Sequence, residues 1–180
     1  MTDQPAAKPD RPRPRAEARS NARLAAVQAL YAIEIAGDDP ESLICDWPAR
    51  PHADPEGDEA DADANAPAPP LDRTFMADVV RRAHAERAEL ARHIREALGH
   101  DGAVERTEAL LRAIMTAGAF ELAQRFDVPA RVVIDEYVRV ARSFYDGGEP
   151  ALINAVLDRV ARAVRPFEMS GVGRAPKATP

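Results

Sequence analysis

Apolar residues recur at spacings of three and four along most of the chain, the pattern of helices that bury one face. The first such stretch covers residues 15–36 and ends at Gly37, a residue type common at helix C-termini. The second covers residues 72–98 and ends at Gly99. The predicted buried positions are Leu24, Val27, Leu30, Tyr31 and Ile35 in the first helix, and Phe75, Val79, Ala83, Leu90, Ile94 and Leu98 in the second.

Three further helices are predicted in the second half of the chain, over residues 104–125, 129–144 and 150–165. Gly118 lies inside the first of them and costs about 1 kcal/mol relative to alanine, so we expect a neighbouring helix to approach closely there. The predicted inner positions are Leu111, Ile114, Met115, Gly118 and Leu122, then Val133, Ile134, Tyr137, Ala141 and Phe144, and finally Ile153, Val156, Leu157, Val160 and Val164.

Two long segments lack the helical pattern. Residues 1–14 and 38–70 contain four and seven prolines and too little apolar surface to offset the entropy cost of ordering. We predict a disordered basic tail (1–14), an acidic insert loop (38–70) in which residues 42–47 form a short turn or helix, and a flexible C-terminal tail (167–180). Residues 15–166 then form one domain of the all-α class, a compact helical bundle.

The composition indicates a soluble, cytoplasmic protein. Of the 180 residues 46% are hydrophobic, yet no apolar run approaches the length of about 18 residues that a membrane span needs, and we expect no membrane association. The first residues lack the apolar core of a signal peptide, and the single cysteine, Cys45, cannot form an internal disulfide.

The net charge of −6 is unusual for a protein that binds nucleic acid, but the charge is unevenly distributed. Residues 37–70 contain ten acidic side chains and one basic side chain, a net charge of −9. Removing this segment leaves the rest of the chain at +3. The acidic insert therefore conceals a mildly basic body.

Arginines are spaced regularly at the start of the first predicted helix. They are Arg11, Arg15, Arg19 and Arg23. From Arg15 onward, this spacing of four predicts one ridge of guanidinium groups, which bind phosphate oxygens bidentately. Ser20 and Asn21 add neutral donors and acceptors. A face that is only solvated is the alternative interpretation.

No group of residues predicts catalysis, a metal site or a cofactor. The four histidines have no His, Cys or acidic neighbour at a convincing metal-ligand spacing. Asp135 and Glu136 are adjacent, and on a helix they point about 100° apart, which argues against an acid–base pair. We therefore expect a protein that is not an enzyme and that carries no cofactor.

Three segments carry motifs in a characteristic order. Residues 22–31 read ARLAAVQALY, residues 111–122 run from LRAIM to FEL, and residues 127–166 contain DVP, VIDE, ARSF, LINAVLD and RP. Together they resemble the NusB family of transcription antitermination proteins, over residues 15–36 and 71–166.

This resemblance implies about seven helices in two small subdomains. It also implies a bacterial antitermination factor that binds the boxA element of nascent single-stranded RNA together with NusE, a ribosomal small-subunit protein, and joins RNA polymerase during ribosomal RNA synthesis. The implied RNA-binding residues are Arg15, Arg19, Ser20, Asn21, Arg23, Arg142, Leu152 and Asn154. Tyr31 and its helix face are candidates for the NusE contact, with a role in the core as an equal alternative.

Other interpretations of the function remain open. One is a stand-alone relative of the NusB-like domain fused to ribosomal RNA cytosine methyltransferases, acting as an RNA-guiding module. Another is a structural helical homodimer without an RNA function. The acidic insert either screens the basic face against unspecific RNA or is a tolerated loop extension. Ser20 and Asn21 stand where the family often has arginine, which favours an RNA site completed by NusE.

Overall fold

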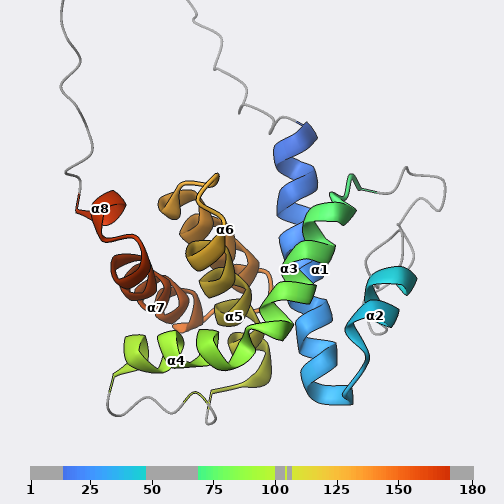
Figure 1. Ribbon diagram of the computed structural model, residues 1–180, viewed down its shortest axis with the longest axis horizontal. Coiled ribbons are helices and arrows are strands. Elements are labelled where there is room, and N and C mark those ends of the chain that lie inside the picture. The colour runs from blue at the N-terminus through green and yellow to red at the C-terminus, as the bar shows by residue number, and fades with distance from the viewer. Residues whose placement is uncertain (1–13, 48–68, 100–103, 105–106, 171–180) are drawn as a thin grey trace, which may run out of the picture.

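The computed structural model describes residues 14–47, 69–99, 104 and 107–170, and all regular secondary structure within these residues is helical (Figure 1). The predicted all-α bundle is therefore confirmed. Most of the predicted tails and residues 48–68 of the predicted insert lie outside the described residues. The helices are α1 (Pro14–Ala36), α2 (Pro40–Asp46), α3 (Arg73–Ala85), α4 (Arg87–Leu98), α5 (Ala109–Gln124), α6 (Ala130–Arg142), α7 (Glu149–Val164) and α8 (Pro166–Met169).

Helix α5 is the centre of the bundle. It is apolar around most of its circumference and packs against α1 and α3 on one side and α4, α6 and α7 on the other. Such an all-round apolar helix is stable only when neighbours enclose it. Figure 1 shows α1, α2 and α3 together at one end of the molecule and α4, α6, α7 and α8 at the other, which confirms the two expected subdomains.

Gly118 of α5 lies against side chains of both α6 and α7. A Cβ atom at this position would lie 2.8 and 2.9 Å from the two methyl carbons of Leu157, and 3.2 Å from Cδ2 of Tyr137. Both neighbouring side chains are fully buried, so neither has free space beside it. The close helix approach predicted from this glycine is confirmed.

The prediction of one long helix over residues 72–98 was wrong, because the chain turns a corner at Glu86 between α3 and α4. Neither glycine nor proline marks this corner. Gln124 holds it instead, accepting from Arg82 at 3.2 Å and donating to Glu86 at 3.0 Å. The turn carries Leu90 and Ile94 onto α5 and α7, where they are buried. Tertiary burial therefore overrides the local preference for a continuous helix.

The start of the acidic insert is helical, as predicted for residues 42–47. Helix α2 begins at Pro40, and Asp39 caps it by accepting the backbone N–H of Ser42 at 2.9 Å. Arg81 of α3 donates to both carboxylate oxygens of Glu41, at 2.5 and 2.6 Å.

One predicted core position at the other end of the bundle was wrong. Phe144 is 41% exposed, because α6 ends at Arg142 and the helical spacing of buried positions ends with it.

Arg165 fixes the loop between α5 and α6. Its guanidinium group is buried and donates to the carbonyl oxygens of Glu121, Leu122 and Arg125 at the end of α5, at 2.6 to 2.9 Å. A further bond reaches the carbonyl of Val128 at 2.7 Å. The planar fork thus adds hydrogen bonds to carbonyl groups at the end of α5, where the supply of intrahelical donors runs out, and it holds the chain that leads into α6.

Candidate nucleic-acid interface

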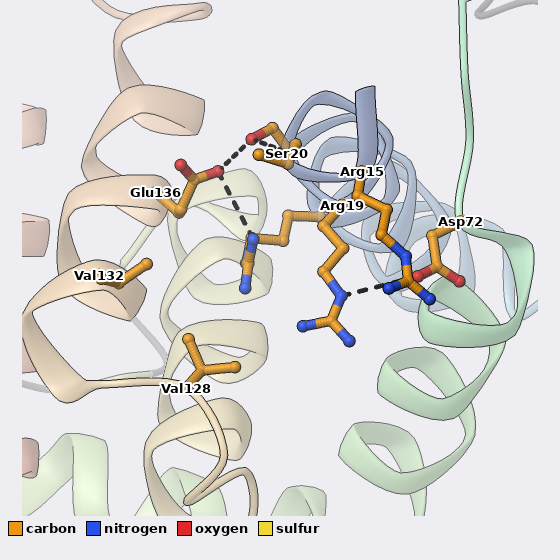
Figure 2. Close-up of a pocket in the computed structure, with 9 residues that line it drawn as sticks. Arg15, Arg19, Ser20, Asp72, Val128, Val132 and Glu136 are labelled. Carbon is orange, nitrogen blue, oxygen red and sulfur yellow. Dashed lines mark hydrogen bonds and ion pairs between the residues drawn. The ribbon is translucent and has the colours of Figure 1, made fainter. Parts of the chain in front are cut away.

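A pocket of 420 Å³ lies between the start of α1 and the start of α6. Figure 2 shows Arg15, Arg19 and Asp72 on one side of it, and Val128, Val132 and Glu136 on the other. The pocket forms where the first two turns of α1 lie beside α6 and beside the N-cap of α3. The predicted arginine-rich helix start therefore lines a concave surface.

Arg15 and Arg19 present their side chains at this pocket. Arg15 is exposed and makes no ion pair with any described residue. The side chain of Arg19 is 44% exposed, and its Nε lies 3.7 Å from Oδ2 of Asp72. Its guanidinium also lies 5.4 Å from the ring centre of Phe75, within the range of a cation–π contact. Arg19 is thus held in place but remains accessible.

Arg23 lies one turn further along α1 and points into the protein. Its guanidinium donates to both carboxylate oxygens of Glu121 at 2.8 Å, and Tyr137 donates to the same carboxylate at 2.7 Å. Burial lowers the pKa of Arg23, but the hydrogen bond and charge of Glu121 outweigh it, so the pKa lies above its ordinary value. Arg23 also pairs with Glu136 at 3.6 Å and lines the inner end of the pocket, but it is only 3% exposed. It therefore anchors α1, and we do not propose a direct RNA contact for it.

The side chains of Ser20 and Asn21 both form hydrogen bonds with other parts of the protein. The hydroxyl group of Ser20 donates to Glu136 at 2.6 Å. The amide of Asn21 donates to the carbonyl of Pro70 at 2.8 Å, which ties the end of the insert to α1. Both residues position neighbouring segments at the edge of the arginine surface, a role that the sequence alone did not indicate.

A second cavity of 850 Å³ lies between α6 and α7, and Arg142 and Asn154 both line it. Arg139 lines it as well and reaches back to the first pocket: it pairs with Glu136 at 2.8 Å and lies 3.4 Å from the Ser20 hydroxyl. The structure thus connects the two cavities through Arg139. Leu152, the remaining predicted residue, is exposed on α7 and is not among the residues that line either cavity.

Sequence reasoning missed Arg139, Glu136 and Asp72. The spacing of three between Arg139 and Arg142 indicated that they share one face of α6. Nothing local indicated that Asp72, which follows the insert, would lie beside Arg19.

Tyr31 lies outside the core. Its side chain is 39% exposed, and Ile35, one turn further along α1, is 62% exposed. Two apolar residues are therefore accessible on one face of this helix, whereas both had been predicted in its buried stripe. Neither residue is among those that line the two arginine cavities, although Tyr31 is near enough to Tyr145, which lines the second cavity, to act on it electrostatically.

No group of three or more His, Cys, Asp or Glu residues in the described part of the chain is arranged to hold a metal ion. No helix among the described residues is long and apolar enough to cross a membrane. The concave arginine surface is the feature that defines the molecule: an all-helical protein with a surface suited to polyanions.

Comparison with known proteins identifies the family. The NusB family profile matches residues 20–162. Transcription antitermination protein NusB of Rhodospirillum rubrum is 40% identical over 178 residues, covering 94% of this chain and 96% of the relative. That of Caulobacter vibrioides is 42% identical over 152 residues, covering 84% and 97%. The chain belongs to the NusB family. A solved structure of T. maritima NusB shares the fold, with a TM-score of 0.65 at 22% identity over 84% of this chain and 96% of that one.

Proposed function

We propose that this protein is a cytoplasmic transcription antitermination factor that binds a boxA-type single-stranded RNA together with NusE and joins RNA polymerase during ribosomal RNA synthesis. The observation that carries the proposal is the line of exposed arginines across two connected cavities. It comprises Arg15, Arg19, Arg139 and Arg142. Membership of the NusB family supports the same function.

A single strand can follow the line of arginines across the surface. Arg139 is 64% exposed and joins the two cavities, so one continuous path leads from α1 over α6 to α7. Each phosphate that such a path neutralises releases counterions, which makes the affinity depend strongly on salt. Asn154 lines the end of this path with a side chain that can donate to and accept from a base edge.

We assign the NusE contact to the exposed face of α1 around Tyr31 and Ile35. Exposed aromatic and aliphatic side chains are typical centres of protein interfaces. Since this face does not line the arginine cavities, RNA and protein partner can bind together. The proposed role is that of an adaptor, with neither catalysis nor a cofactor.

A titration of labelled boxA-like and scrambled RNA, with and without NusE, tests this function. Replacing Arg15 and Arg19 by alanine is expected to weaken boxA binding at least tenfold and to reduce the slope of log affinity against log salt by about 0.7 per arginine. The matched control replaces Arg92 and Arg162, two exposed arginines of α4 and α7 that line neither cavity.

Equal affinity for boxA-like and scrambled RNA, with and without NusE, would contradict the proposal. So would an equal loss of affinity in the control variant, because the effect would then follow from net charge alone. A homodimer whose mass in solution changes with neither RNA nor NusE would instead support the purely structural interpretation.

A further inference from the structure

The pocket between α1 and α6 has one apolar wall. Val128 and Val132 form it, and Val132 is 45% exposed although α6 buries most of its other aliphatic residues. The wall is rigid, because the carbonyl of Val128 accepts from Arg165 and its N–H donates to the carbonyl of Arg125 at 3.1 Å. A fixed aliphatic surface that faces an open pocket suits a flat, weakly polar group rather than a phosphate.

The opposite wall is the guanidinium group of Arg19 (Figure 2). Asp72 on one side and the Phe75 ring beneath hold this planar group in place. Arginine planes and aromatic rings are the surfaces on which unpaired RNA bases stack. Between Arg19 and Val132 there is thus a slot with one planar cationic wall and one aliphatic wall, in a pocket whose 420 Å³ is typical of small-ligand sites.

Two carboxylates line the same pocket and determine which part of an RNA enters it. Asp72 and Glu136 both repel a phosphate from the inside of the pocket, so the phosphates belong at the rim, beside Arg15 and the edge of the Arg19 guanidinium. Oε2 of Glu136 accepts from Ser20 and also lies 3.6 Å from Nη1 of Arg23, while Oε1 forms an ion pair with Arg139 at 2.8 Å. Each carboxylate oxygen can accept two hydrogen bonds, so Glu136 retains acceptor capacity for a further donor.

We propose that this pocket binds one unpaired nucleobase that carries an exocyclic amino group. The base stacks between Arg19 and Val132, and its amino group donates to Glu136. The inference rests on the proposed RNA-binding function and deepens it. Uracil is disfavoured, because it presents a carbonyl oxygen to Glu136 where cytosine presents the amino group.

Abasic substitutions in the RNA, combined with a variant that fills the pocket, test this proposal. Each position of a boxA-like RNA is made abasic in turn, and affinities are measured for the unaltered protein and for Val132→Trp. The control is Ala163→Trp, which places the same side chain at an exposed position of α7 outside both cavities. Thermal unfolding of both variants checks that each one folds.

The expected result is one RNA position at which loss of the base weakens binding about tenfold in the unaltered protein and has no effect in Val132→Trp. At that position cytidine is expected to bind about fivefold or more tightly than uridine. If abasic substitution and Val132→Trp act additively at every position, the pocket holds no base. If cytidine and uridine bind equally there, the assignment to amino-bearing bases is overturned. Either failure leaves the dependence on Arg15 and Arg19 intact and is therefore distinct from failure of the proposed function.

Discussion

Arg23 and Glu121 form a bidentate ion pair at the point where α1, α5 and α6 meet, with both donor–acceptor distances at 2.8 Å. The pair is almost completely enclosed, with side-chain exposures of 4% and 0%. Tyr137 completes it from α6. Because Arg15 and Arg19 lie on the two preceding turns of α1, this pair fixes the rotation of the helix and hence the direction in which both arginines point.

Replacing either partner alone is expected to destabilise the protein strongly. Arg23→Met leaves a buried carboxylate, and Glu121→Leu leaves a buried guanidinium, so each is expected to lower the free energy of unfolding by about 3–5 kcal/mol. The double variant removes both charges and is expected to lose much less than the sum of the two. Urea unfolding of the four proteins measures this. Additive losses would show that the two charges are independent.

Tyr137 is expected to make the protein sensitive to alkaline pH. Burial, and then the charge of Glu121, raise the pKa of Tyr137 well above its ordinary value of 10.0. Above pH 10 the unfolded chain therefore loses this proton while the folded protein keeps it, and stability falls as pH rises, by about 1.4 kcal/mol per pH unit for one proton. Burial also raises the pKa of Tyr145, so this residue makes the fall of stability with rising pH steeper.

The variant Tyr137→Phe isolates the contribution of this one hydroxyl group. It is expected to cost about 1.5–3 kcal/mol below pH 9, because it removes a hydrogen bond to a charged group. The variant also lacks the proton whose loss from the unfolded chain destabilises the unaltered protein above pH 10. The difference in free energy of unfolding between the two proteins therefore shrinks between pH 10 and 11. Urea unfolding at several pH values measures both effects. A difference that stays constant across this range would contradict the raised pKa.

The residues of α1 show how far sequence alone could predict this structure. Val27 and Leu30 are buried as predicted, because helical spacing is a local property. The same spacing predicted that Arg23 shares an exposed ridge with Arg19, whereas Arg23 is buried in the structure. Its partner Glu121 lies 98 residues away, and no local pattern contains that contact.

The candidate site was only partly predictable for the same reason. Arg15, Arg19 and Arg142 were identified from spacing and resemblance, and they line the two cavities. The apolar wall at Val132 was not identified from the sequence, since a single exposed valine on a helix has no distinctive local sequence. Whether a side chain faces solvent, the core or a concave pocket depends on how the helices pack, which here includes the corner at Glu86.

Gly118→Ala is expected to destabilise the protein although alanine favours helices. The helical preference contributes about 1 kcal/mol of stability, but the new methyl group would clash with both methyl carbons of Leu157, and overpacking of this kind costs about 1–3 kcal/mol. The same substitution in a Leu157→Ala background is expected to be neutral or stabilising, because the clashing atoms are gone. Chemical denaturation of the four proteins tests this reversal, and an equal loss in both backgrounds would contradict it.

Asp72→Asn is expected to raise the affinity for RNA. Oδ2 of Asp72 lies 3.7 Å from Arg19 and competes with an RNA phosphate for it, while Oδ1 caps α3 by accepting the N–H of Phe75 at 3.0 Å. Asparagine keeps an oxygen for the cap, so the fold is retained, whereas the competing charge is lost. We expect RNA to bind roughly two to five times more tightly, an effect that diminishes as salt screens the charges. The control Asp158→Asn removes the same charge from α7, where Asp158 pairs with Arg162. An equal gain in that control, or no gain with Asp72→Asn, would show that Asp72 does not compete for Arg19.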